Sequence, residues 1–233
     1  MKKENLLSVF VDESGNFGDT RDLARYCIVT LVLHDQNQDV SQAVQDLDRA
    51  NDDLGLDPET FHFHSMPLIR QDDEYAAMSR RMRGRILDRM LTFVRNVDFS
   101  YCSFCVDTNF VNTPDQVFGR LKREMSEFIV THKVAFERLG SVKVYYDAGQ
   151  KQVSRLLEET IGTLLGCPMT FEHGARQGAY KFLQVADLIC TVELISRRLA
   201  DGVTLPRAER RFFGGPRDFK RNLLKKIRQK RLV

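Results

Sequence analysis

The chain has 233 residues, of which 42% are hydrophobic and 29% charged. This composition excludes a wholly disordered chain, a collagen and a small disulfide scaffold. The formal net charge is only +3, but the charge is unevenly placed, since residues 207–233 hold eleven lysines and arginines against Glu209 and Asp218. This segment, the basic tail, follows a mildly acidic body, and such asymmetry indicates a polyanionic partner.

The start of the chain is unlike a secretory signal. Its apolar run at 6–11 is shorter than the roughly 7–15 residues of a signal peptide, and Asp12 and Glu13 end it. No run approaches the roughly 18 apolar residues of a membrane span. The cysteines are few, odd in number and scattered, which is typical of a reducing compartment. The sequence therefore predicts a cytoplasmic protein without a membrane partner.

Hydrophobic periodicity predicts strands that alternate with helices. Strands are expected at 6–12, 26–33, 61–64, 99–106, 141–147 and 169–173, and helices at 40–54, 73–96, 114–138, 150–165 and 180–199. A long polar connection joins the first two strands, which favours an antiparallel hairpin. The pattern predicts one α/β domain with a mixed sheet over residues 1–206, followed by the basic tail at 207–233.

Acidic residues come directly after two of the predicted strands. Asp12 and Glu13 end the almost continuously apolar first strand, and Asp147 ends strand 141–147. A carboxylate at the end of a central strand is costly unless it is paired or bound to a metal. Both places are also good turn sequences, so the alternative at each is a simple turn.

The last predicted helix of the body is nearly all apolar in its middle. Gln184, Asp187 and Thr191 form one narrow polar stripe along it, because each residue advances the helix by about 100°. A buried Asp187 needs a metal ion, a lysine or arginine, or a proton to offset its charge. The alternative is a buried hydrogen-bonded pair with Gln184 that only fixes helix packing. Glu193 lies on the opposite side, where Arg197 at i+4 is expected to pair with it.

Two strand-end carboxylates and one from a late helix can converge on one cluster. Carboxylate oxygens hold hard divalent cations, and two ions about 3.5–4 Å apart can clamp the attacking and leaving oxygens of a phosphodiester. Asp12, Asp147 and Asp187 are therefore predicted to hold Mg²⁺ or Mn²⁺, with Glu13 as a fourth candidate. This is the chemistry of RNase H-like nucleases. Their first Asp lies on a central strand hairpin-joined to the next, their second on the neighbouring fourth strand, and their last acid on a late helix.

Residues 9–15 contain an Asp-Glu-Ser-Gly motif, residues 184–188 contain a Gln-x-x-Asp motif, and Tyr146-Asp147 ends an acidic strand between them. In these three places the sequence resembles the bacterial family known as domain of unknown function 3800. The resemblance spans roughly residues 6–200 and implies an RNase H-like, three-layer fold with metal-dependent nuclease activity. Carried over by position, it implies Asp12, Asp147 and Asp187 as metal ligands, with Glu13 as a possible fourth. Gln184 is expected to orient Asp187, and Ser14 to lie beside the ligands. The basic tail lies outside the shared pattern.

His62 and His64 are two residues apart on a predicted strand, so both are expected to point to one face. His64 is a candidate to deliver a proton to the leaving group or to ligate metal. The alternative is a surface histidine pair beside the core residues Phe61 and Phe63.

The residue pattern of the basic tail predicts an amphipathic helix. Phe219, Leu223 and Ile227 are spaced as one apolar stripe. Its nucleic-acid-binding candidates are Lys220, Arg221, Lys225, Lys226 and Arg228. The alternatives are a membrane surface, for which no large apolar anchor is present, and an ordinary C-terminal helix that docks on the acidic body.

The leading hypothesis is a divalent-metal-dependent nuclease that hydrolyses DNA or RNA phosphodiester bonds. One alternative is a module on the same fold that grips nucleic acid or a partner protein without catalysis. Another is a component of a phage-defence or mobile-element system that is active only with a partner. The nuclease hypothesis requires the carboxylates of Asp12, Asp147 and Asp187 to lie close together.

Overall fold

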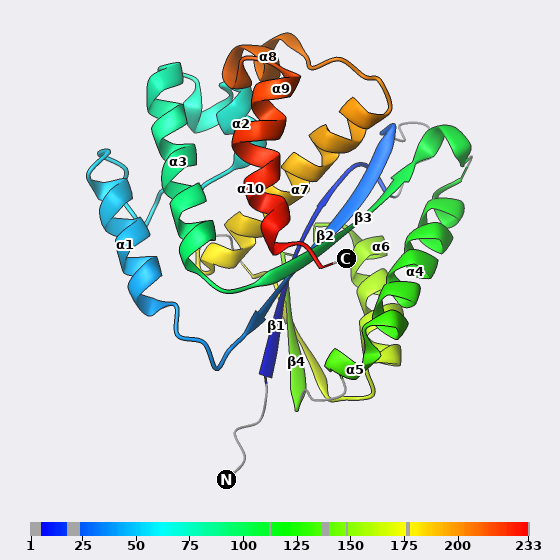
Figure 1. The fold of residues 1–233 in the computed structure, drawn as a ribbon. Helices are drawn as coiled ribbons and strands as arrows, with labels where there is room; N and C mark the ends of the chain where they lie inside the picture. Colours follow the sequence, from blue (N-terminus) through cyan, green and yellow to red (C-terminus); the bar gives the residue numbers. More distant parts are fainter. Residues whose placement is uncertain are drawn as a thin grey trace.

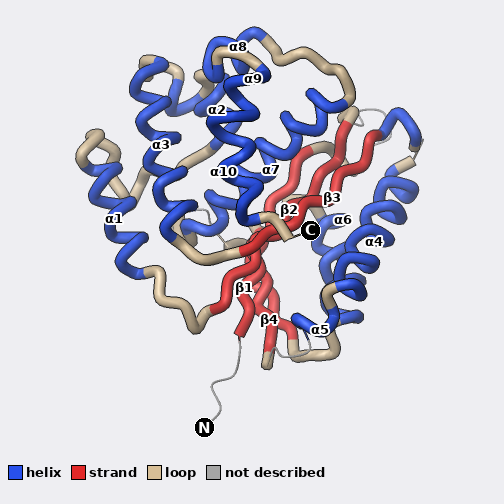
Figure 2. Tube along the Cα trace, in the orientation of Figure 1, coloured by secondary structure: helices blue, strands red, loops and turns tan. Residues whose placement is uncertain are grey.

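The computed structural model describes residues 6–17, 24–111, 113–136, 140–147, 149–175 and 178–232. These residues form a central sheet with helices on both faces (Figure 1). The strands are β1 (Leu6–Ser14), β2 (Tyr26–Asp35), β3 (Ser100–Asp107), β4 (Ser141–Tyr146) and β5 (Met169–His173). They lie in the order β3-β2-β1-β4-β5, and Figure 2 shows the twisted sheet between the helical layers.

Strand β1 lies at the centre of a mixed sheet. It pairs antiparallel with β2 and parallel with β4, while β2–β3 is antiparallel and β4–β5 parallel. Both faces of β1 are covered, since its neighbours Val9 and Phe10 are only 1% and 5% exposed. This double burial explains why the strand is almost continuously apolar. The predicted mixed α/β sheet is confirmed.

Two hydrophobic cores, one on each face of the sheet, hold the three layers together. Phe10 and Tyr145 point into one core, and Val9 and Val11 point into the other. The first core is covered by α1 (Ser41–Asp52), α2 (Ser65–Arg70), α3 (Arg80–Asn96), α7 (Lys181–Ala200), α8 (Arg207–Phe213), α9 (Pro216–Phe219) and α10 (Lys225–Ile227). The second is covered by α4 (Pro114–Thr131), α5 (Lys133–Phe136) and α6 (Lys151–Leu157). Short 3₁₀ or π turns are η1 (Asp73–Tyr75), η2 (Thr108–Phe110), η3 (Glu158–Gly162), η4 (Lys220–Leu224) and η5 (Arg228–Lys230).

The segment 61–64 is not the predicted strand. It is a loop that leads into α2, a short helix that the sequence pattern did not predict. Phe63 inserts into the core, where it is 2% exposed, and Phe61 packs partly buried against the same core. Two aromatic side chains of a loop that turn toward the core produce the same period-two pattern as a strand.

Two predicted helices are interrupted. The range 73–96 divides into η1 and α3, because Ser79 caps α3 by accepting a hydrogen bond from the Met82 N–H at 3.2 Å. The range 114–138 divides at His132 into α4 and α5, and positions 137 and 138 lie outside the described residues. Within the described residues, no helix combines the length and the apolar character needed to cross a bilayer.

The basic tail folds onto the body beside α3 and α7 (Figure 1). The predicted apolar stripe is buried, with Phe219 and Ile227 each 0% exposed in the core that also holds α7. Two hydrogen bonds fix the end of the tail to β3 and to the residue that follows α3. Lys230 Nζ donates to the Val97 carbonyl at 2.8 Å, and the Leu232 N–H donates to the Tyr101 carbonyl at 2.8 Å. The docked helix expected as one alternative is therefore observed.

Candidate active site

The acidic residues predicted as metal ligands gather at one edge of the sheet. Strands β1 and β4 run parallel and remain paired through Phe10 and Tyr145. Asp12 and Asp147 each follow that pair by two residues, so they leave the same edge at the same level. Helix α7, which carries Asp187, packs across β1 and β2. The fold thus brings together the three acids that the motifs singled out.

Asp12 lies on β1, on the face covered by α7. The thiol of Cys190 on that helix lies beside its carboxyl group. Burial raises the pKa of Asp12 well above its usual value, and the nearby charges of Asp187, Glu13 and Asp147 raise it further. Asp12 is therefore a partly buried acid surrounded by other acids.

Asp187 is held by Ser65, the first residue of α2. The Ser65 N–H donates to Asp187 Oδ2 at 2.8 Å, and the Ser65 hydroxyl donates to Asp187 Oδ1 at 2.7 Å. Burial raises the pKa of Asp187 even though the Ser65 hydrogen bonds and the nearby His64 act in the opposite direction. Both contacts with Ser65 come from neutral donors, so they orient the carboxylate without supplying a positive charge.

The rest of the polar stripe on α7 holds the same loop. Gln184 Oε1 accepts a hydrogen bond from the Phe63 N–H at 3.3 Å, and Thr191 Oγ1 lies 2.7 Å from the Ser65 hydroxyl. The stripe therefore positions segment 63–65 against α7. Sequence reasoning missed Ser65 because it lies 122 positions from Asp187, in a region predicted to be a strand followed by a loop.

Glu13 and Asp147 lie on either side of Gly149. A Cβ atom at that glycine would sit 3.2 Å from Glu13 Oε1 and 3.4 Å from Asp147 Oδ1. Glu13 Oε1 accepts hydrogen bonds from the Tyr146 hydroxyl at 2.9 Å and from Gln150 Nε2 at 3.4 Å. Burial and the charge of Asp147 raise the pKa of Glu13, although these hydrogen bonds oppose the shift. The carboxylates of Glu13 and Asp147 therefore both lie close to the space beside Gly149, and a side chain at position 149 would occupy part of that space.

The two histidines of segment 61–64 lie in different surroundings. His64 lies close enough to Asp187 for its charge to lower the pKa of that acid, and its N–H lies 3.0 Å from the Tyr75 hydroxyl oxygen. The ring of His62 instead lies over Gly178, where a Cβ would meet it. With no strand at this position, the expectation that both histidines point to one face is wrong. Ser14, the other motif residue, pairs with Ile28 of β2.

The acids approach one another without forming a ready-made metal cage. Within the described ranges, no group of three or more His, Cys, Asp or Glu side chains is arranged to hold a metal ion. The donor chemistry, carboxylate oxygen, nevertheless suits Mg²⁺ or Mn²⁺. Mg²⁺ in particular keeps several waters and is usually bound through one or two carboxylates plus substrate phosphates. The residues therefore fit an ion that completes its shell with water and substrate.

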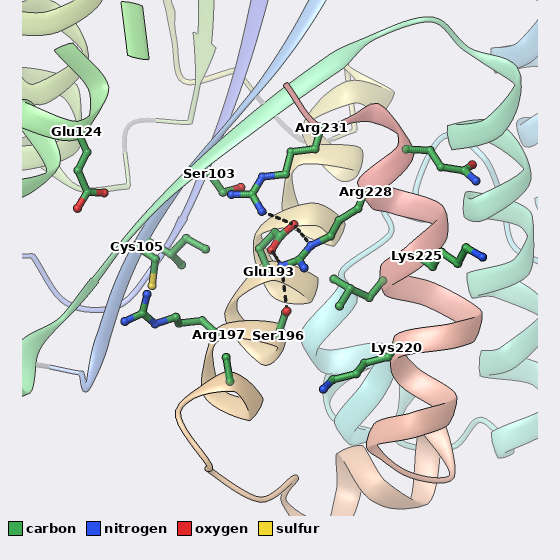
Figure 3. A pocket seen from close by; sticks show the side chains of 14 residues that line it. Ser103, Cys105, Glu124, Glu193, Ser196, Arg197, Lys220, Lys225, Arg228 and Arg231 are labelled. Carbon is green, nitrogen blue, oxygen red and sulfur yellow. Dashed lines mark hydrogen bonds and ion pairs between the residues drawn. The ribbon is translucent and has the colours of Figure 1, made fainter. Parts of the chain in front are cut away.

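The predicted nucleic-acid-binding residues divide between two sides of the basic tail. Lys220, Lys225 and Arg228 line a cavity of about 860 Å³ between the tail, α7 and β3 (Figure 3). Arg221 pairs with Asp218 at 3.3 Å, and Lys226 lines a different hollow, beside α3. The tail is thus not one uniform basic face.

The predicted ion pair on the far side of α7 is wrong. Glu193 pairs with Arg228 at 2.8 Å rather than with Arg197, whose Nε lies 2.9 Å from Asp201 Oδ2. Local spacing favoured the i,i+4 partner, but the docked tail brings a guanidinium from 35 positions away. Glu193 therefore pairs with a residue of the docked tail instead of with the i+4 residue on its own helix.

Comparisons with known proteins find similarity only among solved structures. No family model matches the chain, and no curated protein matches it. Among solved structures, the chain is similar to one described as the structure of the PCNA:RNase HII complex from Archaeoglobus fulgidus. That match has 18% identity and a TM-score of 0.39, and it covers 94% of this chain and 87% of the other. A TM-score this low does not establish a common fold.

Proposed function

We propose that this chain is a divalent-metal-dependent nuclease with an RNase H-like fold, which hydrolyses phosphodiester bonds of DNA or RNA. The topology supports the proposal. Asp12 lies on a central strand joined antiparallel to the next, Asp147 follows the neighbouring fourth strand, and Asp187 lies on a late helix. These are the positions implied by the resemblance to the domain of unknown function 3800 family.

One observation carries the proposal: among the described residues, no cationic side chain is one of the groups that shift the pKa of Asp12. Burial and three neighbouring carboxylates raise this pKa instead. Buried acids are costly unless they are paired, protonated or bound to a metal. A divalent cation would supply the missing positive charge.

The chain's own residues have distinct roles in this proposal. Asp12, Asp147 and Asp187 would hold Mg²⁺ or Mn²⁺, which when bound neutralises charge on the phosphoryl oxygens and activates water. Ser65 orients Asp187 through two hydrogen bonds.

Groups beside the aspartates complete the proposed site. The Tyr146 hydroxyl orients Glu13 at 2.9 Å. His64, which lies near Asp187, is placed to deliver a proton to the leaving oxygen, because an imidazole ring can act as a general acid.

The test is a panel of labelled single-stranded DNA, duplex DNA, RNA and RNA–DNA hybrid, incubated with Mg²⁺, Mn²⁺ or EDTA. We expect cleavage of at least one substrate with a divalent ion, none with EDTA, and a loss of at least about a hundredfold in Asp187→Asn. Asp52→Asn, at an exposed acid on α1, is the matched control and should cleave normally. Absence of cleavage across the panel, or unchanged cleavage by Asp187→Asn, would overturn the proposal.

A second candidate function is a nucleic-acid-binding module without catalysis. The basic cavity of the tail favours it, because this surface lies apart from the acidic cluster. This candidate predicts salt-dependent binding that survives Asp12→Ala, with no cleavage in the same panel.

A further inference from the structure

A cavity of about 860 Å³ lies between the tail, α7 and β3. Its floor includes Ser103 and Cys105 of β3, and its walls are α7 and the helical tail (Figure 3). The lining carries the cations Arg197, Lys220, Lys225, Arg228 and Arg231, against the acids Glu124 and Glu193. The cavity is therefore basic overall, and it opens to solvent.

A buried carboxylate fixes the centre of this cavity. Arg228 donates to both oxygens of Glu193, at 3.1 and 2.8 Å, and also to the Ser196 hydroxyl at 3.0 Å. Tyr101 donates to Glu193 at 2.7 Å, and Arg231 lies 3.9 Å away. Because Glu193 is 5% exposed while the guanidinium groups remain partly exposed, it orients two cations whose outer edges face the cavity.

Lys220 adds a further positive charge to the lining of this cavity. Its side chain is exposed and points into the cavity in Figure 3. In the described part of the chain, neither Lys220 nor Lys225 has a carboxylate partner. Arg228 offsets Glu193 and Arg197 pairs with Asp201, so the charges of Lys220, Lys225 and Arg231 are available to an anion.

We propose that this cavity binds backbone phosphates of a nucleic-acid strand, with Lys220, Arg228 and Arg231 as its principal contacts. Arginine and lysine side chains gathered in a concave site are typical of phosphate recognition. The lining includes no aromatic side chain, so bases have no ring to stack on and the binding is independent of sequence. The choice of nucleic acid as the ligand rests on the proposed function.

Helix α7 separates this cavity from the acidic cluster. Gln184 and Asp187 contact the loop before α2, whereas Glu193 and Arg197 face the tail. Binding in the cavity therefore does not need the metal or the aspartates. It supplies the attraction for phosphate that an acidic cleavage site lacks.

The experiment measures fluorescence anisotropy of labelled oligothymidylate and oligouridylate with the full chain in EDTA, over a range of salt concentrations. Lys220→Ala/Arg231→Ala removes one lysine and one arginine from the cavity. Arg221→Ala/Lys226→Ala removes the same two residue types from the outer side of the same tail, so it is the matched control. All four side chains are largely exposed or at the rim, and thermal unfolding verifies that both variants fold.

We expect the cavity variant to bind about tenfold more weakly, with a salt slope lower by about 1.4, since each single-strand phosphate contact contributes about 0.7. The control should lose less than about threefold. Equal losses in the two variants, or none in the cavity variant, would overturn the cavity assignment. Complete displacement of the oligonucleotide by an equal concentration of nucleoside triphosphate would show that the cavity binds a free nucleotide. That result would overturn the proposal that it binds a nucleic-acid strand.

The two proposals fail separately. Asp187→Asn should bind as tightly as the unaltered chain in EDTA. Binding that depends on the cavity, without cleavage in any condition, would support the phosphate-binding cavity and overturn the proposed nuclease activity. Cleavage with an unchanged KM in Lys220→Ala/Arg231→Ala would support the nuclease proposal and overturn the role of the cavity in binding nucleic acid.

Discussion

Helix α7 carries two carboxylates with opposite surroundings. On one side, neutral donors from Ser65 hold Asp187, and burial raises the pKa of this acid. On the other side, burial would raise the pKa of Glu193, but hydrogen bonds from Arg228 and Tyr101 outweigh it and lower the pKa. Six positions apart on one helix, the first acid has a raised pKa and the second, which pairs with a guanidinium group, has a lowered one.

The difference separates a structural acid from a candidate functional one. Glu193 joins the tail to the body, and its charge is already offset by a bidentate guanidinium contact. Asp187 is also held by hydrogen bonds, but those from Ser65 and the charge of His64 lower its pKa less than burial raises it. An oriented, uncompensated carboxylate is suited to a cation that arrives from solution.

The largest expected effect is on stability, at Glu193. Glu193→Ala leaves the buried Tyr101 hydroxyl and Arg228 without their shared acceptor, so we expect the free energy of unfolding to fall by about 3 kcal/mol. Urea denaturation measures it. Glu127→Ala, at an exposed acid on α4, should change stability by less than about 0.5 kcal/mol. A loss no larger than that in Glu193→Ala would mean that the tail is not anchored through this acid.

The sequence predicted more of the acidic edge than of the tail. Asp12, Asp147 and Asp187 could be placed because strand ends and helix periodicity are local patterns, and the topology then brings those ends together. The partners of Asp187 and Glu193 could not be predicted in this way. Ser65 and Arg228 reach them from 122 and 35 positions away, and no local pattern encodes which distant segment packs against a helix face.

The next largest expected effect is stabilisation of the fold by a bound metal ion, and we expect it only on the side of α7 that carries Asp187. A divalent ion that binds the folded state should stabilise the chain by about 2.7 kcal/mol at a hundredfold excess over its Kd. Thermal unfolding with and without Mg²⁺ or Mn²⁺ measures this. We expect Asp12→Asn to lose the stabilisation and Asp52→Asn, at an exposed position, to keep it. Equal stabilisation of all three proteins would place any bound ion elsewhere.

A smaller effect is expected from the group that orients Asp187. Ser65→Ala removes the hydroxyl that donates to Asp187 Oδ1 at 2.7 Å but keeps the backbone N–H contact. Loss of such an orienting partner typically costs ten- to a hundredfold in metal affinity or activity, and we expect the lower end. Thr191→Val, which removes only the hydroxyl behind Ser65, should retain metal affinity within about threefold. Mn²⁺ titration compares the two variants, and equal affinities would show that Ser65 only packs the loop.

The smallest effect, a pH dependence, has opposite signs on the two sides of α7. The folded pKa of Asp187 is raised above its usual value of 3.8, so the folded state holds a proton that the unfolded chain releases, and stability falls as pH rises through this window. The folded pKa of Glu193 is lowered from 4.5, so its contribution is present above 4.5 and is lost as pH falls through the folded value.

Urea denaturation in EDTA at a series of pH values separates these contributions. Asp187→Asn should become more stable relative to the unaltered chain as pH rises above 3.8, because it lacks the buried charge. Glu193→Gln should lose its disadvantage as pH falls below 4.5, because the protonated acid no longer pairs with Arg228. Parallel curves for Asp187→Asn and the unaltered chain would mean that the acid is already compensated, and the contrast between the two sides of α7 would then disappear.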